Sequence, residues 1–212
     1  MDMAHEYKFN GIELHSAYEV KGENTDELYR KTIEYGLKVP CIDIAAEVSE
    51  NMDEAAAEFD YACRVAAKLH TEYFRIKSDG DAKPFISKIL KKAEESGITV
   101  LVETAGAYAD TAKLRELLEY FASDSLAALW DFHHPYREHG ESPETTVTNL
   151  GAYIKHIHIK DSDAENGYCL MGEGTLPVNE FINALKSVNF EGFISLEWDP
   201  KWVEEISASD VI

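Results

Sequence analysis

Four short apolar segments between residue 98 and the C-terminal region each end close to a side chain that can bind a metal ion. The segments are ITVLVET, LAALWDF, IKHIHIKD and FISLEWD, and the side chains are Glu103, Asp131, His158 and Glu197. Each gap between them is long enough for a loop, a helix and a return of the chain. A strand followed by a helix, repeated, builds a parallel sheet whose strands all end on one face. The pattern therefore predicts an α/β fold with three carboxylates and an imidazole on that face.

The same alternation of strand and helix runs through the whole chain. Strands are predicted at 9–14, 39–45, 72–77, 99–104, 126–132, 154–161 and 192–199, and helices near 25–36, 53–69, 81–96, 111–122, 145–151 and 178–188. No linker rich in Pro, Gly or Ser interrupts this order, so we expect residues 1–212 to form one domain. The opening MDMAHEYK resembles the end of a helix that leads into the first strand.

Parallel strands are covered on both faces by helices or closed into a barrel. Seven predicted strands are one short of the TIM (β/α) barrel, so the sequence predicts a TIM barrel that lacks its first strand. A doubly wound open sheet is the alternative, and the absence of a Gly-rich phosphate turn after any strand disfavours it. A missing strand exposes the edges of 9–14 and 192–199, and exposed edges are usually covered or paired. We therefore expect a homodimer or another homo-oligomer.

Composition excludes several classes of partner. The formal net charge of −20 and the absence of a cluster of Lys and Arg argue against binding to nucleic acid. No apolar run is long enough to span a bilayer, so we expect no membrane partner. The three cysteines are too scattered for a disulfide framework, and we expect a cytoplasmic protein.

The four strand-end side chains share one register, because each is the last or next-to-last inward position of its strand. Taken singly, each has an ordinary structural explanation, such as a helix cap or a hydrogen-bonded interior histidine. Together they predict one divalent metal ion bound by Glu103, Asp131, His158 and Glu197. Carboxylate and imidazole ligands suit Mn, Mg, Co or Zn as the divalent ion, and the ligand set does not choose among them.

The segments LVETAG, LWDFHHP, HIHIKD, GEG and SLEWDP resemble the xylose isomerase-like TIM-barrel superfamily of sugar isomerases and epimerases. Its relatives include ketose 3-epimerases, inosose dehydratases and isomerases, and 3-dehydroshikimate dehydratases. The resemblance implies the same four metal ligands. The Asp-x-x-His motif of the ketose epimerases matches Asp131 and His134, which implies that His134 contacts substrate oxygens. The family's His-x-Lys-Asp element matches His158, Lys160 and Asp161.

The resemblance and the chemistry together predict an isomerase or epimerase that acts on a small carbohydrate. A divalent ion stabilises the enediolate that forms when a proton leaves the carbon next to a carbonyl. Glu103 and Glu197 are the predicted catalytic groups that take and return this proton. Lys160, His15 and Lys77 are predicted to reach the substrate, because all three lie at the C-terminal ends of strands.

Other activities remain open from the sequence. A lyase of the same superfamily, which dehydrates an inosose or 3-dehydroshikimate, needs the same enediolate followed by loss of a β-hydroxyl. An inactive barrel that serves as a binding or assembly subunit is favoured by the missing strand and disfavoured by the intact ligand set. The endonuclease IV branch needs more metal ligands and a DNA-binding surface, which the net charge of −20 disfavours.

Overall fold

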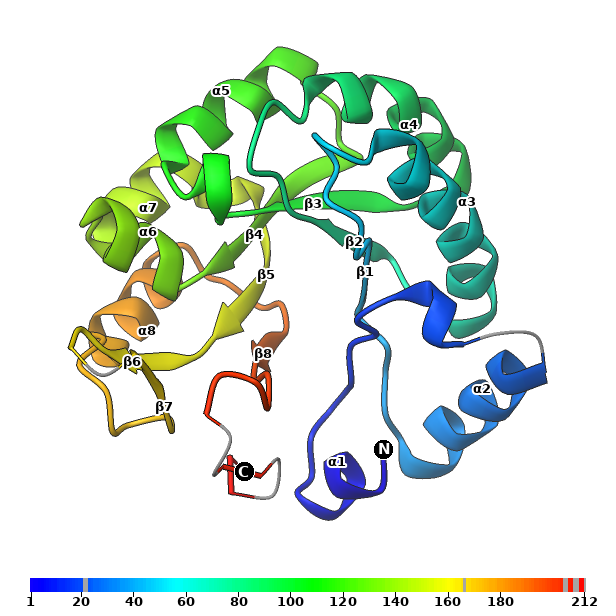
Figure 1. Ribbon diagram of the computed structural model, residues 1–212, viewed down its shortest axis with the longest axis horizontal. Helices are drawn as coiled ribbons and strands as arrows, with labels where there is room; N and C mark the ends of the chain where they lie inside the picture. Colours follow the sequence, from blue (N-terminus) through cyan, green and yellow to red (C-terminus); the bar gives the residue numbers. More distant parts are fainter. Residues whose placement is uncertain (21–22, 166, 204–205, 208–209, 212) are drawn as a thin grey trace.

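The computed structural model describes residues 1–20, 23–165, 167–203, 206–207 and 210–211, and its central element is one curved parallel sheet. The strands follow the order β1 (Cys41–Asp43), β2 (Tyr73–Ile76), β3 (Thr99–Glu103), β4 (Leu126–Asp131), β5 (Ile154–Ile159) and β8 (Ile194–Leu196). Every neighbouring pair is parallel. Figure 1 shows the strands curling around the inside of an incomplete ring, with the helices outside. The predicted incomplete TIM barrel is therefore confirmed.

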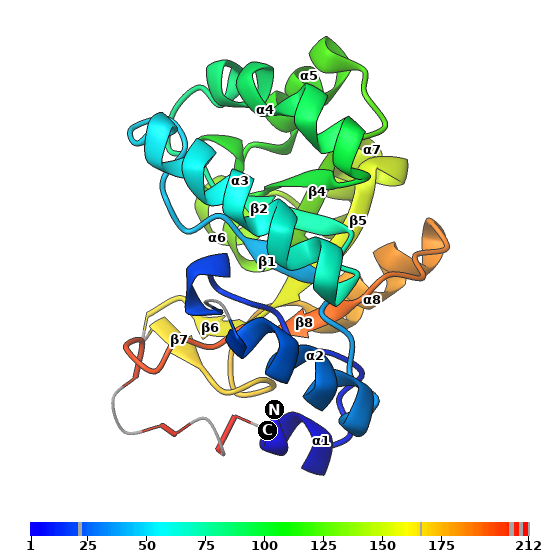
Figure 2. The same ribbon diagram turned by 90° about the vertical axis from the view of Figure 1, so that its right-hand side faces the viewer.

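Helix α1 (Asp2–Glu6) precedes the strands, and most of the later helices connect successive strands around the outside of the sheet (Figure 1). The later helices are α2 (Glu23–Tyr35), α3 (Met52–Leu69), α4 (Lys83–Ser96), α5 (Thr111–Phe121), α6 (His133–His139), α7 (Pro143–Leu150) and α8 (Val178–Ser187), with short 3₁₀ turns at Ala17–Glu19, Gly106–Tyr108 and Gly151–Tyr153. Figure 2 shows α3 lying over β1 and β2. The helix α4 ends at Gly97, which has a φ of 67° and caps the helix in the left-handed conformation.

Alternation along the strands separates an apolar outer face from a mixed inner face. Outward side chains such as Phe74, Val100 and Trp130 are fully buried beneath the helices. Inward side chains of Leu101 and Leu129 form a small second apolar cluster inside the barrel. The next inward positions toward the C-terminal ends of the strands are polar. The charged groups inside the barrel therefore lie next to the small apolar cluster.

The first predicted strand is only partly formed. Residues 9–14 run parallel to the segment before and including β1, joined by isolated bridges from Gly11 to Lys38 and from Leu14 to Ile42. The second segment has one more residue between the bridges than the first. Pro40 lies in that interval and has no N–H to donate, which explains the break in the ladder. The prediction of seven strands is therefore wrong by one, and the predicted strand 39–45 is reduced to β1.

The C-terminal half contains two elements that the sequence analysis did not predict. The His- and Pro-rich stretch after β4, which lies outside the predicted helices and strands, forms α6. After β5, the strands β6 (Asp161–Asp163) and β7 (Gly167–Cys169) form an antiparallel hairpin. Within the described residues, none of the helices has the length and apolar character required to cross a membrane.

An opening separates residues 9–14 from β8, and we call this opening the seam. Among the described residues, no backbone hydrogen bond joins its two sides. Figure 1 shows the opening between the N-terminal segment and the last strand. A pocket of about 1510 Å³ lies there, lined by residues 7–13 on one side and by residues 191–202 on the other.

Candidate metal centre

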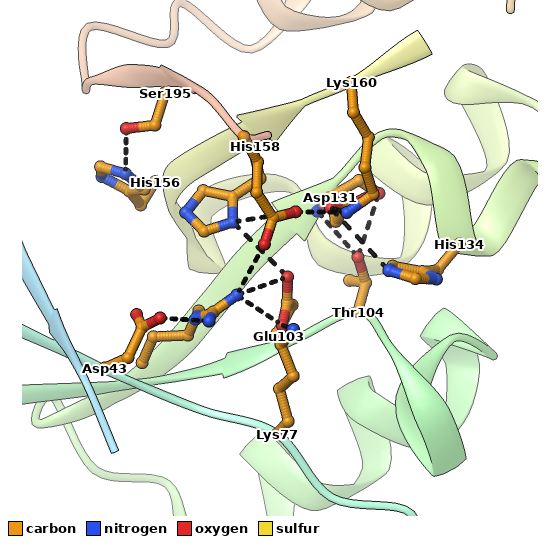
Figure 3. Close-up of polar contacts among 12 residues, drawn as sticks. Asp43, Lys77, Glu103, Thr104, Asp131, His134, His156, His158, Lys160 and Ser195 are labelled. Carbon is orange, nitrogen blue, oxygen red and sulfur yellow. Dashed lines mark hydrogen bonds and ion pairs between the residues drawn. The ribbon is translucent and has the colours of Figure 1, made fainter. Parts of the chain in front are cut away.

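The four predicted ligands come together at the C-terminal ends of neighbouring strands. Glu103 and Asp131 end β3 and β4, His158 lies near the end of β5, and Glu197 directly follows β8. One donor atom from each of the four side chains lies within 4.8 Å of the other three. Figure 3 shows Glu103, Asp131 and His158 directed toward a common point.

This donor set fits a divalent cation. The Nδ1 atom of His158 lies 3.5 Å from a carboxylate oxygen of Glu103 and 3.9 Å from one of Glu197. That nitrogen is buried and has no hydrogen-bond partner. Three carboxylates and one imidazole nitrogen match the preferences of Mg, Mn, Co or Zn, so these residues could hold such an ion.

Two cationic side chains also contact the ligand carboxylates. Arg75, on β2, is buried, and its Nη1 lies 3.1 Å from Glu103 and 3.3 Å from Glu197. The other end of its guanidinium pairs with Asp43 on β1. Lys160 is also buried, and its ammonium group pairs with Asp131 and Glu197. Without an ion, these two cations neutralise charge that would otherwise be buried unpaired.

The pKa values of the site follow from this packing of charges. Burial would raise the pKa of Glu197, but the Lys160 ammonium outweighs it and lowers the pKa to about 2. Burial would lower the pKa of His158, but the carboxylate of Glu13 outweighs it and raises the pKa to about 10. The raised pKa favours the protonated ring, and a metal ion bound at His158 Nδ1 would have to displace a proton.

Three of the four predicted substrate-binding residues lie next to the ligands. Besides Lys160, the Nζ of Lys77 is 3.5 Å from Glu103, and the Nε2 of His134 is 4.0 Å from Asp131. The Nδ1 of His134 also contacts Glu138, at 2.7 Å. His15 is farther out, with a largely exposed ring 3.5 Å from Asp43. His15 and Lys77 both line the pocket at the seam.

Asp131 also has a local structural role. One of its carboxylate oxygens accepts a hydrogen bond from the backbone N–H of His133 at 2.7 Å, at the start of α6. Its own backbone N–H donates to Thr104 Oγ1 at 2.9 Å, and the Thr104 hydroxyl donates back to the Asp131 carbonyl oxygen at 3.2 Å. These contacts fix the end of β4 relative to the end of β3, and so place Asp131 opposite Glu103.

Sequence reasoning missed three charged residues of the site, namely Glu13, Asp43 and Arg75. Arg75 precedes Lys77 by two positions and so lies on the same inward face of its strand. Asp43 is the register partner of Arg75 on β1, so its side chain is on the same inward face. The alternation of side chains along each strand could therefore have placed both residues inside the barrel. Glu13 lies in the partly formed first strand, and its contacts across the barrel have no signal in the local sequence.

Comparison with known families gives one match over almost the whole chain. The family model described as "Xylose isomerase-like TIM barrel" matches residues 1–210. Among curated proteins, the chain is similar to the fructoselysine 3-epimerase of Escherichia coli O157:H7, with 25% identity over 126 residues. That match covers 57% of this chain and 46% of the epimerase. The chain thus spans less than half the length of this curated relative.

Solved structures share the fold. The probable 3-DHS dehydratase AsbF of Bacillus anthracis has a TM-score of 0.77 and 22% identity, over 93% of this chain and 85% of that chain. The IOLI protein with a binding zinc atom has a TM-score of 0.80 and 14% identity, over 99% and 87%. At these identities the likeness concerns the fold alone.

Proposed function

Because this chain belongs to the xylose isomerase-like TIM-barrel family, we propose that it is a metal-dependent isomerase or epimerase of a small carbohydrate. The observation that carries the proposal is the convergence of Glu103, Asp131, His158 and Glu197, with donor atoms within 4.8 Å of one another. The epimerase activity named for the curated relative supports the reaction class. The zinc atom named for the IOLI structure supports a divalent ion, for which Mn, Mg, Co and Zn are the candidates.

In the proposed reaction, the ion supplies Lewis-acid stabilisation of the enediolate. Glu103 and Glu197 lie on strands separated by β4 and β5, so their carboxylates approach the centre from different sides. One takes the proton from the carbon next to the carbonyl, and the other returns a proton to the opposite face. Lys160, Lys77, His134 and His15 would bind and orient the substrate oxygens.

The substitution Glu197→Gln tests this role. The amide cannot accept the substrate proton, so we expect the rate of proton exchange to fall by at least about a hundredfold. The measurement is deuterium incorporation from heavy water into ketohexoses, followed by mass spectrometry. Glu180→Gln, which changes an exposed carboxylate on α8, is the control and should exchange at the wild-type rate. Exchange at the wild-type rate in Glu197→Gln would remove Glu197 from the mechanism.

A dehydratase is the second candidate, favoured by the likeness to the AsbF fold. The same proton abstraction would then be followed by loss of a β-hydroxyl as water. Incubation with inososes and 3-dehydroshikimate distinguishes the two reactions. A dehydratase forms an unsaturated product with new ultraviolet absorbance, whereas an epimerase incorporates deuterium and leaves the absorbance unchanged.

We also propose that residues 1–212 form one domain in the cytoplasm and that two copies associate at the seam. The edge of β8 lacks a strand partner on its outer side among the described residues. Tyr7, Phe9 and Ile194 are exposed large apolar side chains around this opening. Pairing with a second copy would cover these side chains and the strand edge.

A further inference from the structure

The carboxylate of Glu13 contacts both histidines of β5 from the other side of the seam. Its Oε1 lies 2.6 Å from His156 Nε2, and its Oε2 lies 3.1 Å from His158 Nε2. His156 is fully buried and His158 nearly so. Glu13 itself lies between the two isolated bridges that attach residues 9–14 to β1. One side chain of the partly formed first strand therefore meets the ligand histidine.

This contact determines which nitrogen of His158 faces the other ligands. A carboxylate only accepts hydrogen bonds, so Nε2 must carry the proton that it donates to Glu13. The remaining nitrogen, Nδ1, is the one directed at Glu103 and Glu197, and it has no hydrogen-bond partner. A metal-binding histidine commonly donates its second N–H to a carboxylate, which fixes the ring and its tautomer.

His156 anchors the same carboxylate. Its Nε2 lies 3.0 Å from Ser195 Oγ on β8, in addition to the contact with Glu13. Glu13 is thus held by two rings on one strand, and it cannot rotate away from His158 without losing the contact with His156. Glu13, His156 and His158 could also be considered as ligands of a second ion, because their donor atoms lie within 4.8 Å of one another. The hydrogen-bonding distances favour the simpler assignment, in which each Glu13 oxygen accepts a hydrogen bond from one ring N–H.

We infer that Glu13 is the positioning residue of the metal centre: it fixes the His158 ring so that Nδ1 is the ligand atom. The inference rests on the proposed metal-dependent function. It adds a residue from the first predicted strand to a site whose predicted ligands all come from residue 103 onward. Glu13 acts through His158 and makes no contact with the ion itself.

The test compares Zn²⁺ affinity, by competition with a chelator, in the wild type, Glu13→Gln and Glu58→Gln. Glu58 is the control, because its carboxylate is also shielded from solvent, more deeply than that of Glu13, but contacts Ser16 and the Ala46 N–H instead of a predicted ligand. We expect the wild type to bind one ion, Glu13→Gln to bind it about 10–100-fold more weakly, and Glu58→Gln to bind it as the wild type does. A second readout is ¹⁵N NMR of the histidine rings in the zinc-loaded wild type, which should show Nδ1 coordinated and Nε2 protonated for His158.

The outcomes separate this inference from the function on which it rests. Wild-type protein that binds no Zn²⁺ overturns the metal centre, and the role of Glu13 with it. Wild-type protein that binds one ion, with equal affinity in Glu13→Gln, overturns only the role of Glu13. Two bound ions in the wild type, one of them lost in Glu13→Gln, would make Glu13 a ligand and also contradict the inference. If Glu13→Gln does not fold, the NMR spectrum of the wild type decides, and coordination through Nε2 refutes the assignment.

Discussion

Lys160 sits between two carboxylates that would also bind the ion, so its charge has opposite effects on the two states of the protein. In the metal-free state it neutralises Asp131 and Glu197 inside the barrel. In the metal-bound state its ammonium group competes with the ion for the same oxygens. The substitution Lys160→Met therefore separates a role in stability from a role in metal affinity.

We expect Lys160→Met to lower the free energy of unfolding of the metal-free protein by about 3–5 kcal/mol, because the fully buried carboxylate of Asp131 and the partly buried one of Glu197 lose a partner. The loss should be much smaller with saturating Mn²⁺, and the Mn²⁺ affinity should rise. Urea unfolding with EDTA and with Mn²⁺ measures both effects. Lys88→Met removes an exposed ion pair with Asp53 and should change stability by less than about 1 kcal/mol in either condition. An equal loss with and without Mn²⁺ would contradict this view of Lys160.

The convergence of the four side chains proposed as ligands could be predicted because strand alternation is a local property of the sequence. Glu103 and His158 lie at inward positions of strongly apolar strands, where parity determines the direction of the side chain. The contacts of Arg75 and Glu13 could not be predicted in the same way. Both depend on which side chains meet across the barrel, and that is set by the curvature of the sheet rather than by any local pattern.

The loop after the β6–β7 hairpin is held by the carboxylate of Asp161, the neighbour of Lys160. Asp161 accepts hydrogen bonds from the backbone N–H groups of Gly172, at 3.0 Å, and Gly174, at 3.1 Å. A Cβ added at Gly174 would overlap the Asp161 carboxylate and lie 2.6 Å from the Ser162 carbonyl oxygen. The GEG segment is therefore needed for close approach of the loop to the end of β5.

From this packing, Gly174→Ala should lower the free energy of unfolding by about 1–3 kcal/mol, because the added methyl group cannot be accommodated without a backbone shift. Urea unfolding measures the change. Glu173→Ala alters the exposed neighbour and should stay within about 0.5 kcal/mol of the wild type. Wild-type stability in Gly174→Ala would mean that the loop can relax away from Asp161.

Elements that depend on distant partners were the hardest to predict. The segment 9–14 has the composition of a strand, yet it forms only two bridges, because Pro40 interrupts its ladder and β8 does not pair with its other edge. The stretch after β4 contains Pro135 and two adjacent histidines and has no helical prediction, yet Asp131 accepts the His133 N–H and a helix follows. In both cases tertiary context outweighed the local signal.

Association at the seam can be tested by a substitution that introduces one charged side chain into the proposed contact. Ile194 lies on the edge strand β8 and is 44% exposed. Lysine at this position would place an ammonium group inside the proposed contact, so Ile194→Lys should sediment as a monomer and the wild type as a dimer. Ile33→Lys changes an isoleucine that is 67% exposed on α2 and should remain dimeric. A monomeric wild type in analytical ultracentrifugation would refute the seam dimer.

In the proposed metal centre, the side-chain contact of Glu13 would couple closure of the barrel to binding of the ion. Residues 9–14 are attached by few backbone contacts, and part of what holds them is the hydrogen bond to a metal ligand. Two equilibria that share one contact are thermodynamically linked. If the ion raises the equilibrium constant for docking of residues 9–14 by some factor, docking raises the binding constant of the ion by the same factor. A partner that binds at the seam and holds residues 9–14 in place would then increase the affinity for the ion. Loss of the ion would weaken the attachment of residues 9–14 before that of the other strands.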